Sequence, residues 1–269
     1  MLEWLKSRFS RSTSKKSDSE SPYDLVVGAY SEFQCRNFGD AEGLLMKALK
    51  HRDEVDDPVL NEYILAYLSS IWLLQGQYSE AIRFFSEYIA RHPDDAAGYH
   101  DRADALWYSG QLKGAIDDYS RTLQLSPTCI PALSSRGQVL VDMDQCDKAL
   151  MDLDLALDYL RQNPYFTLEW AKAIRAYICN GRAAALARLG SFEEASKQFE
   201  KSITLCPDNA WVYFNRARVY DSRAEREKAI SDYEFALAKQ NPPLCIPKKE
   251  QAQNRLRELL GAKGPKLAR

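Results

Sequence analysis

One alanine recurs through this chain of 269 residues at a nearly constant interval, and this recurrence constrains the fold more than any other feature of the sequence. Five copies are separated by 34, 34, 46 and 34 residues. A large apolar residue follows each copy by four positions, so the two side chains lie one turn apart on the same face of a helix. The alanines are Ala81, Ala115, Ala149, Ala195 and Ala229, with a weaker copy at Ala41, and the apolar residues are Leu45, Phe85, Tyr119, Leu153, Phe199 and Tyr233.

A turn signal and a stop signal accompany the alanine. The turn position lies five residues before it, and in three copies a proline lies 12 residues after it. Each unit is therefore predicted to contain a helix, a tight turn, a second helix and a stop. The turn residues are Gly76, Gly110 and Gly190, replaced by Asp144 and Ala224 in two copies, and the prolines are Pro93, Pro127 and Pro207.

These features together resemble the tetratricopeptide repeat, and the segments YSEAIRFFSEYIARHP and SFEEASKQFEKSITLCP match it closely. The resemblance implies an all-α fold, a right-handed superhelical solenoid of antiparallel helix pairs. One helix pair cannot bury its apolar face alone, so each pair packs on the next. About six pairs are expected over 22–241, at 22–61 (degenerate), 62–95, 96–129, 130–175 (with an insertion), 176–209 and 210–241.

The insertion adds 12 residues between Ala149 and Ala195. Because Asn163-Pro164 is its turn signal, we expect the next helix to start near Thr167, to overhang its neighbours and to end near Leu189. The apolar residues on this overhang either pack back on the stack or form a docking ledge. They are Leu168, Trp170, Ile174 and Tyr177.

Both ends of the chain are basic and the middle is acidic. Residues 1–17 carry a net charge of +4 and residues 248–269 carry +5, which leaves −11 for residues 18–247. We interpret 1–21 as a basic N-terminal segment with a Ser-rich linker, and 242–269 as a C-terminal capping helix with a basic tail. Leu2, Leu5 and Phe9 share one helical face within the N-terminal segment, which lies on an anionic membrane, caps the first unit or forms a tail.

An arginine recurs at the seventh place of four first helices, and a polar residue recurs three places after the landmark alanine on the second helix. A cation at a core-facing place needs a partner, so we predict pairs between the two helices. Their repetition indicates an architectural role. The pairs are Arg102 with Asp118, Arg136 with Asp152 and Arg216 with Asp232, with Arg182 and Gln198 as the uncharged variant.

In the resembled family the first helix of each unit lines a concave groove through its places 2, 5, 6, 9, 12 and 13. Here these places form one aromatic and acidic zone, which suits a segment containing Lys or Arg, and one aromatic and basic zone. Such compositions occur in binding hot spots and also in unoccupied groove walls. The candidate peptide-binding residues are Tyr63, Tyr67, His100, Asp101, Asp104 and Tyr108 in the first zone, and Tyr177, Asn180, Arg188, Trp211, Asn215 and Arg218 in the second.

The family also has a clamp for a C-terminal carboxylate, built from Lys, Asn and Arg side chains of three consecutive units. The corresponding places here lack the cations, so binding to the C-terminal tail of a chaperone is not favoured. The three sets are Ala66, Ser70, Asp101, Pro131 and Ser135; His100, Asp104, Ser135, Tyr177 and Gly181; and Ser134, Gln138, Gly181, Trp211 and Asn215.

Catalysis, metal binding and secretion have no signal in this sequence. It holds no nucleophile elbow, phosphate loop or metalloprotease motif, and its six cysteines and three histidines include no CxxC spacing. We expect no enzyme activity, no metal and no cofactor. The first 17 residues lack the apolar run of a secretory signal, so a cytoplasmic location is expected.

The sequence therefore predicts a non-catalytic scaffold or adaptor that binds a peptide segment or helix of a partner protein in the groove. The alternative is a membrane-peripheral assembly factor anchored by the N-terminal segment. Nucleic-acid binding is not favoured, because a net charge of −2 gives no overall attraction to a polyanion.

Overall fold

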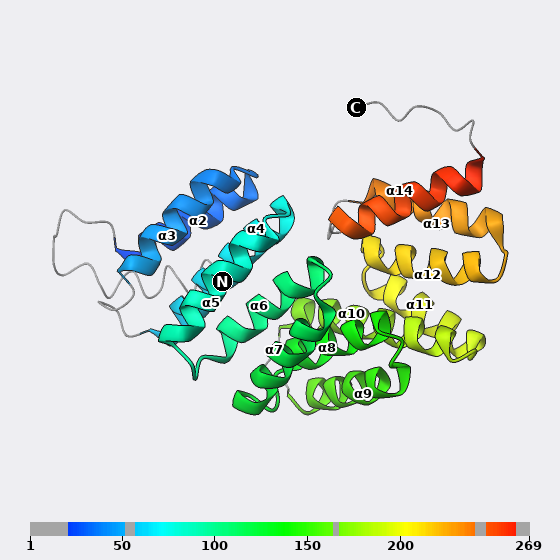
Figure 1. Ribbon diagram of the computed structural model, residues 1–269, viewed down its shortest axis with the longest axis horizontal. Helices are drawn as coiled ribbons and strands as arrows, with labels where there is room; N and C mark the ends of the chain where they lie inside the picture. The colour runs from blue at the N-terminus through cyan, green and yellow to red at the C-terminus, as the bar shows by residue number, and fades with distance from the viewer. Residues whose placement is uncertain (1–20, 52–56, 164–166, 240–245, 262–269) are drawn as a thin grey trace. The chain divides into compact units, whose positions relative to one another are not determined.

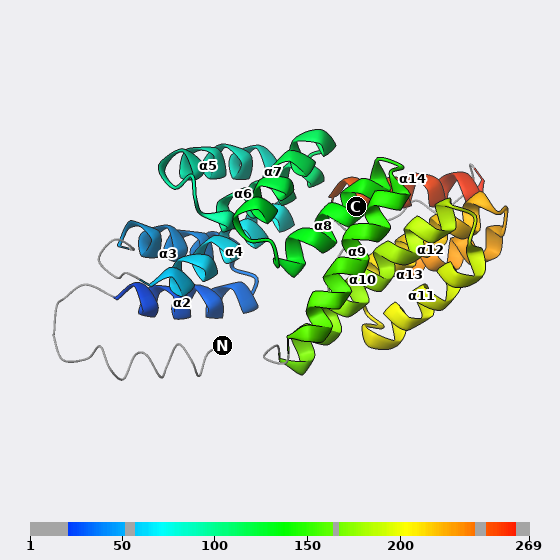
Figure 2. The ribbon, with the colours of Figure 1, turned by 90° about the horizontal axis from the view of Figure 1, so that it is seen from below.

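The computed structural model describes residues 21–51, 57–163, 167–239 and 246–261, and these residues form 13 helices (Figures 1 and 2). Successive helices pack as pairs, which confirms the predicted all-α repeat architecture. The N-terminal segment, with Leu2, Leu5 and Phe9, lies outside the described residues. Within the described ranges, no helix combines the length and the apolar composition that crossing a bilayer requires.

The helices belong to two compact units, Met1–His92 and Pro93–Arg269. The first unit contains α2 (Pro22–Gln34), α3 (Phe38–Lys50), α4 (Pro58–Gln75) and α5 (Tyr78–Arg91). The second contains α6 (Ala96–Tyr108), α7 (Leu112–Leu125), α8 (Ile130–Asp142), α9 (Cys146–Gln162), α10 (Leu168–Arg188), α11 (Phe192–Leu205), α12 (Ala210–Ser222), α13 (Arg226–Ala238) and α14 (Ile246–Leu260). Within it, α6 with α7, α8 with α9, α10 with α11 and α12 with α13 are the extensively packed pairs.

The turn inside each pair uses the same left-handed backbone conformation at the predicted position. Gly76, Gly110 and Gly190 have φ values of 72°, 85° and 83°. Asp144 and Ala224 take the place of glycine with φ values of 61° and 58°. Aspartate tolerates this region better than most residues, but alanine costs about 1–2 kcal/mol there, so the packing of the flanking helices must offset the strain at Ala224.

The landmark residues form the core between the paired helices. The six alanines are at most 1% exposed, and the six large apolar residues that follow them are at most 2% exposed. The small side chain lets the two helices approach, and the large side chain fills the remaining space. Each large side chain contributes roughly 1.5–3 kcal/mol through burial alone.

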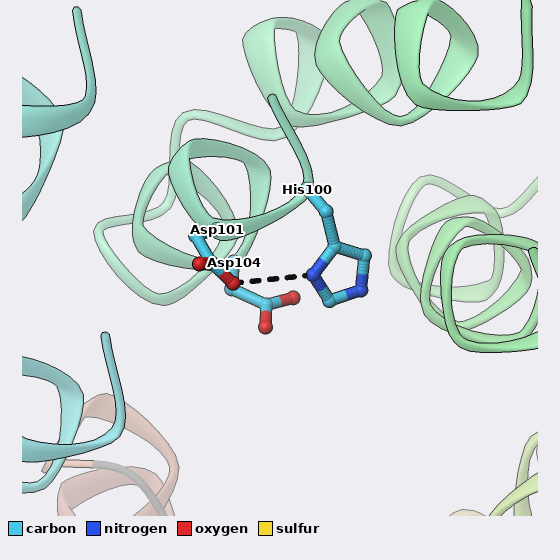
Figure 3. Close-up of side chains that lie close together, drawn as sticks. All are labelled: His100, Asp101 and Asp104. Carbon is cyan, nitrogen blue, oxygen red and sulfur yellow. Dashed lines mark hydrogen bonds and ion pairs between the residues drawn. The ribbon is translucent and has the colours of Figure 1, made fainter. Parts of the chain in front are cut away.

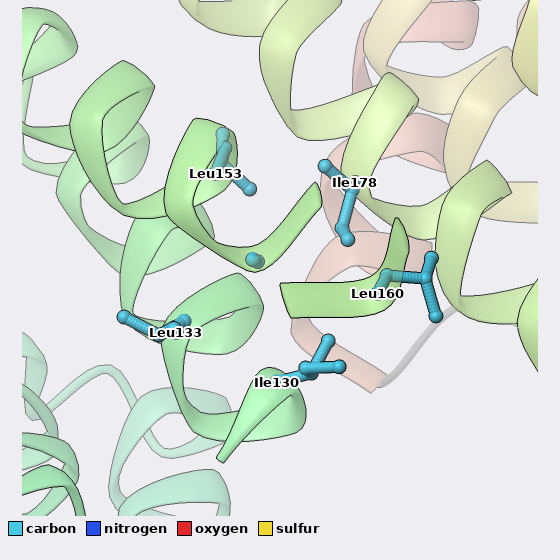
Figure 4. Close-up of a cluster of buried hydrophobic side chains, with 6 residues drawn as sticks. Ile130, Leu133, Leu153, Leu160 and Ile178 are labelled. Atoms are coloured by element: carbon cyan, nitrogen blue, oxygen red, sulfur yellow. The ribbon is translucent and has the colours of Figure 1, made fainter. Parts of the chain in front are cut away.

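The overhanging helix is present, since α10 runs over Leu168–Arg188 with Thr167 as its N-cap. Its first half packs back against α8 and α9, where Ile130, Leu133, Leu153, Ala156, Leu160 and Ile178 form a buried cluster (Figure 4). Trp170 and Ile174 cover this cluster, whereas Leu168 is 69% exposed. Of the apolar residues predicted on the overhang, Trp170 and Ile174 therefore pack on the core, whereas Leu168 is open to solvent.

The three predicted Arg–Asp pairs join the first and second helix of their pair. In each, the guanidinium Nε and Nη2 atoms donate to the two carboxylate oxygens of one aspartate at 2.6–2.8 Å. The hydrogen bond to Asp118 raises the pKa of Arg102, and the hydrogen bond to Asp232 raises the pKa of Arg216. The aspartates are 6–9% exposed, so these pairs are part of the interior.

Arg182 differs from this pattern. Instead of Gln198, its ion-pair partner is Asp154 on α9, the second helix of the preceding pair. A carboxylate compensates the guanidinium charge better than an amide does, and the packing of α10 on α9 brings the two side chains together. Burial lowers the pKa of Arg182, which is consistent with a less complete set of hydrogen bonds.

Candidate functional site

The first predicted zone takes residues from both units, and each part is described separately. In the first unit, Tyr63 and Tyr67 lie on α4. The ring of Tyr67 packs edge-on against Tyr30 and Phe33, with centroid distances of 6.0 and 5.5 Å. Burial raises the pKa of Tyr67 to about 12. Tyr67 is thus partly a core residue of its unit.

In the second unit, His100, Asp101 and Asp104 form a polar cluster on α6 (Figure 3). His100 Nδ1 lies 3.3 Å from Asp101 Oδ1, and the buried hydroxyl of Tyr119 donates a hydrogen bond to Asp104. Burial raises the pKa of Asp101, and the hydrogen bond from His100 opposes that rise. Although one atom of each could approach a cation, both carboxylates already accept from neighbouring side chains, so we interpret the cluster as a structural network.

The first helices of the second unit form one continuous layer, because α6 contacts α8, α8 contacts α10, and α10 contacts α12. Side chains at the two ends of this layer nevertheless meet. The ring of Trp211 on α12 lies 5.8 Å from Trp107 and 5.9 Å from Tyr108, both on α6. Two helices lie between α6 and α12 in the layer, so the layer must curve, and we call its inner side the concave face.

This curvature corrects the separation of the two predicted zones. Tyr108 was assigned to the first zone and Trp211 to the second, yet their rings are neighbours. Trp107 stacks on Tyr108 at 5.1 Å and completes a three-ring cluster. The sequence pattern describes each repeat by itself, so it does not show which repeats the curvature brings together.

Asp142, at the end of α8, is a central residue of the concave face and is not among the predicted site residues. Its carboxylate accepts from Trp107 Nε1 at 3.0 Å and from Lys248 Nζ at 3.2 Å, and forms an ion pair with Arg218 Nη1 at 3.8 Å. The three donors come from α6, α14 and α12. Asp142 occupies the thirteenth place of its repeat, as Tyr108 and Arg188 do. This groove-lining place is the feature of the sequence that points to Asp142.

The remaining second-zone residues make contacts within the layer. Asn215 Nδ2 donates to Oδ1 of the fully buried Asn180 at 3.1 Å. Arg188 donates to the Val141 carbonyl and pairs with Asp144 at 3.3 Å. The carbonyl of Tyr177 accepts from Gln138 at 3.1 Å.

Arg218 lies beside the ring of Phe214, with its Cζ atom 5.8 Å from the ring centre. Burial and the neighbouring Arg188 lower the pKa of Arg218, and Asp142 opposes that fall. A hollow of about 320 Å³ continues from these two side chains towards α14, where Gln251 and Arg255 line it. The concave face therefore carries the partly exposed side chains of Tyr108 and Arg218 beside one convergent carboxylate, and aromatic residues and arginine are enriched in protein interfaces.

Comparison with known proteins establishes the family. A family model described as TPR repeat matches residues 183–221, from α10 into α12. The crystal structure of a tetratricopeptide repeat protein from Parabacteroides merdae has the same fold, with a TM-score of 0.52 and 21% identity over 90% of this chain and 100% of that chain. The chain is a tetratricopeptide repeat (TPR) protein. The matching model describes a repeat and not an enzyme family.

Two relatives of this TPR protein have names that refer to chaperone systems. One is DnaJ homolog subfamily C member 3 of Homo sapiens, 27% identical over 177 residues, which are 63% of this chain and 34% of the relative. The other is Hsp70-Hsp90 organizing protein 3 of Arabidopsis thaliana, 29% identical over 92 residues, which are 34% of this chain and 16% of the relative. The TPR protein thus spans about a third or less of the length of these relatives.

Proposed function

We propose that this TPR protein is a non-catalytic adaptor that binds a segment or helix of a partner protein on the concave face of its second unit. The observation that carries the proposal is the convergence of Trp107, Tyr108 and Trp211 beside Asp142 and Arg218. Aromatic and arginine side chains dominate the binding energy of protein interfaces. Trp107 and Trp211 are 5% and 9% exposed and support this face from within, whereas Tyr108 and Arg218 are partly exposed and can reach a partner.

The relatives support a role in protein binding, since one of them is named as an organizing protein of Hsp70 and Hsp90. We propose a different mode of recognition for this chain. The places that correspond to the carboxylate clamp hold Ala66, Ser70, Asp101 and similar residues without the required cations. The partner segment is therefore expected to be internal or helical and not a free C-terminal tail.

We also propose a cytoplasmic setting. The five cysteines in the described part of the chain, Cys35, Cys129, Cys146, Cys179 and Cys206, are free thiols. Cys35 is exposed and still free, and free thiols are typical of a reducing compartment. Fractionation of source cells, with the protein detected in the soluble fraction, is the corresponding measurement.

The test of the adaptor function is affinity capture from source lysate with three full-length chains. These are the wild type, a double variant Tyr108→Ala and Arg218→Ala, and the control Lys201→Ala, which truncates an exposed cation on α11. All three are first compared by circular dichroism to establish equal folding. We expect a partner that the wild type and the control retain, and that the double variant captures at least about tenfold less. Equal recovery by all three chains would place the binding surface elsewhere.

A further inference from the structure

Lys248 makes a contact that the repeat architecture does not explain. It lies on α14, and its Nζ atom is 3.2 Å from both carboxylate oxygens of Asp142, 106 residues earlier. Both side chains are only 16% exposed. The ammonium group also lies 5.8 Å from the centre of the Phe214 ring, the same ring that Arg218 faces. Lys248 of α14 therefore places its ammonium group beside a carboxylate and an aromatic ring of the concave face.

The rest of α14 is held by contacts of another kind. Ala252 and Leu256 are buried and α14 packs against α13, as the first helix of a further pair would. Arg255 forms two hydrogen bonds with Asp221 at 2.6 and 2.8 Å, and its side chain is 44% exposed. Removing Lys248 from Asp142 would therefore leave these anchors of α14 in place.

Without Lys248, the Asp142 carboxylate would lack its nearest cation. It would keep the indole donor of Trp107 at 3.0 Å and the more distant Arg218 at 3.8 Å. A carboxylate with so little access to water favours a nearby cation. The Phe214 ring is 1% exposed beside Lys248 and Arg218, so departure of Lys248 frees room at the ring for another cation. Lysine and arginine are the protein side chains with this charge and reach.

We propose that Asp142 and the Phe214 ring form a receptor for a lysine or arginine side chain of the partner segment, and that Lys248 occupies this receptor in the free chain. The inference rests on the adaptor function proposed above and specifies its chemistry. A partner cation and Lys248 compete for one carboxylate, so binding releases the start of α14. The start of α14 thereby acts as an internal competitor. A partner segment that is acidic, or that carries little positive charge, does not displace Lys248.

The test uses the full chain with ¹⁵N-labelled tryptophan, because the Trp107 indole N–H donates to Asp142 and reports on that carboxylate directly. Trp107→Phe assigns the signal. The probe is a synthetic heptapeptide with the sequence of residues 246–252, IPKKEQA. It contains the counterpart of Lys248 and lacks Arg255, which anchors α14. Two matched peptides replace the lysine that corresponds to position 248 by norleucine or by glutamate. The chains are the wild type, Lys248→Ala, and Arg255→Ala as a control that loosens α14 without vacating Asp142.

We expect Lys248→Ala to shift the Trp107 signal, and the lysine peptide to return it towards its original position. The lysine peptide should bind the Lys248→Ala chain about tenfold more tightly than the wild type or Arg255→Ala, because the intramolecular competitor is gone. The norleucine peptide should bind at least about fivefold more weakly than the lysine peptide.

Equal binding of the three peptides, stronger binding of the glutamate peptide, or no return of the Trp107 signal would overturn the receptor assignment. These outcomes are separate from a failure of the adaptor function. A partner captured through Tyr108 and Arg218 would still establish the concave face as a binding surface even if no peptide replaced Lys248.

Discussion

The Arg136–Asp152 pair offers a quantitative test of the view that the recurring ion pairs are architectural. Arg136 gives Asp152 two hydrogen bonds, at 2.7 and 2.8 Å, and a third to Ser120 at 3.0 Å. The two side chains are 23% and 12% exposed. Arg136→Leu keeps apolar volume at this place but leaves the carboxylate without its cation. Breaking a buried pair costs about 3–5 kcal/mol, and the residual access to water places this loss at about 3 kcal/mol.

A loss of this size lowers the melting temperature of a unit of this length by roughly 6–12 °C. The double variant Arg136→Leu and Asp152→Leu removes both charges and should lose only about 1 kcal/mol, because an apolar pair replaces the ion pair without an unpaired charge. Urea unfolding of the full chain, followed by circular dichroism, measures the wild type, both single variants and the double variant. If Arg136→Leu costs less than about 0.5 kcal/mol, or if the double variant loses the sum of the two single losses, the pair is not a coupled structural element.

Two further predictions concern stability. Gly181→Ala should destabilise the fold by about 1–3 kcal/mol, because a Cβ there would lie 2.5 Å from Nε2 of Gln138. Gln138 is 6% exposed, and moving it away breaks its hydrogen bond to the Tyr177 carbonyl. The control Gly43→Ala meets nothing within 4 Å and should be neutral or stabilising by up to about 1 kcal/mol. Thermal unfolding compares the two variants, and equal effects would contradict the packing at Gly181. The next prediction concerns Asp101, whose pKa burial raises in the folded state. Folding therefore favours the protonated carboxyl. The resulting stability is complete below the ordinary carboxyl pKa and is lost as the pH rises through the raised pKa. Asp101→Asn should therefore be more stable than the wild type at pH 7, with the difference disappearing towards about pH 3, and a pH-independent difference would exclude this cause.

The repeat frame predicted the local structure because its signals act within one helix pair. Ala81 and Phe85 are one helical turn apart, and Arg216 and Asp232 are 16 residues apart in the chain. The frame also identified turns at Asp144 and at Ala224, and alanine itself disfavours the left-handed conformation. There the period outweighed residue preference, since the packing of the two helices fixes the position of the turn.

The repeat pattern did not show which side chains of distant repeats come into contact. The contact of Trp107 with Trp211 and that of Asp142 with Lys248 depend on the curvature of the layer. Curvature accumulates from small rotations between successive pairs, and no single residue specifies it. Asp142 stood at a groove-lining place, but nothing in the sequence indicated that a lysine 106 residues later would reach it.

The two classes of ion pair in this protein therefore have different consequences for function. The Arg–Asp pairs recur in three helix pairs with the same separation of 16 residues, and each forms as soon as its own two helices pack. The Asp142–Lys248 pair occurs across a separation of 106 residues and forms only when α8, α12 and α14 are in place together. A competing partner can thus exchange this one contact without opening any helix pair. Uncovering the receptor breaks a largely buried ion pair, and a lysine or arginine of the partner offsets that loss because it forms the same pair with Asp142.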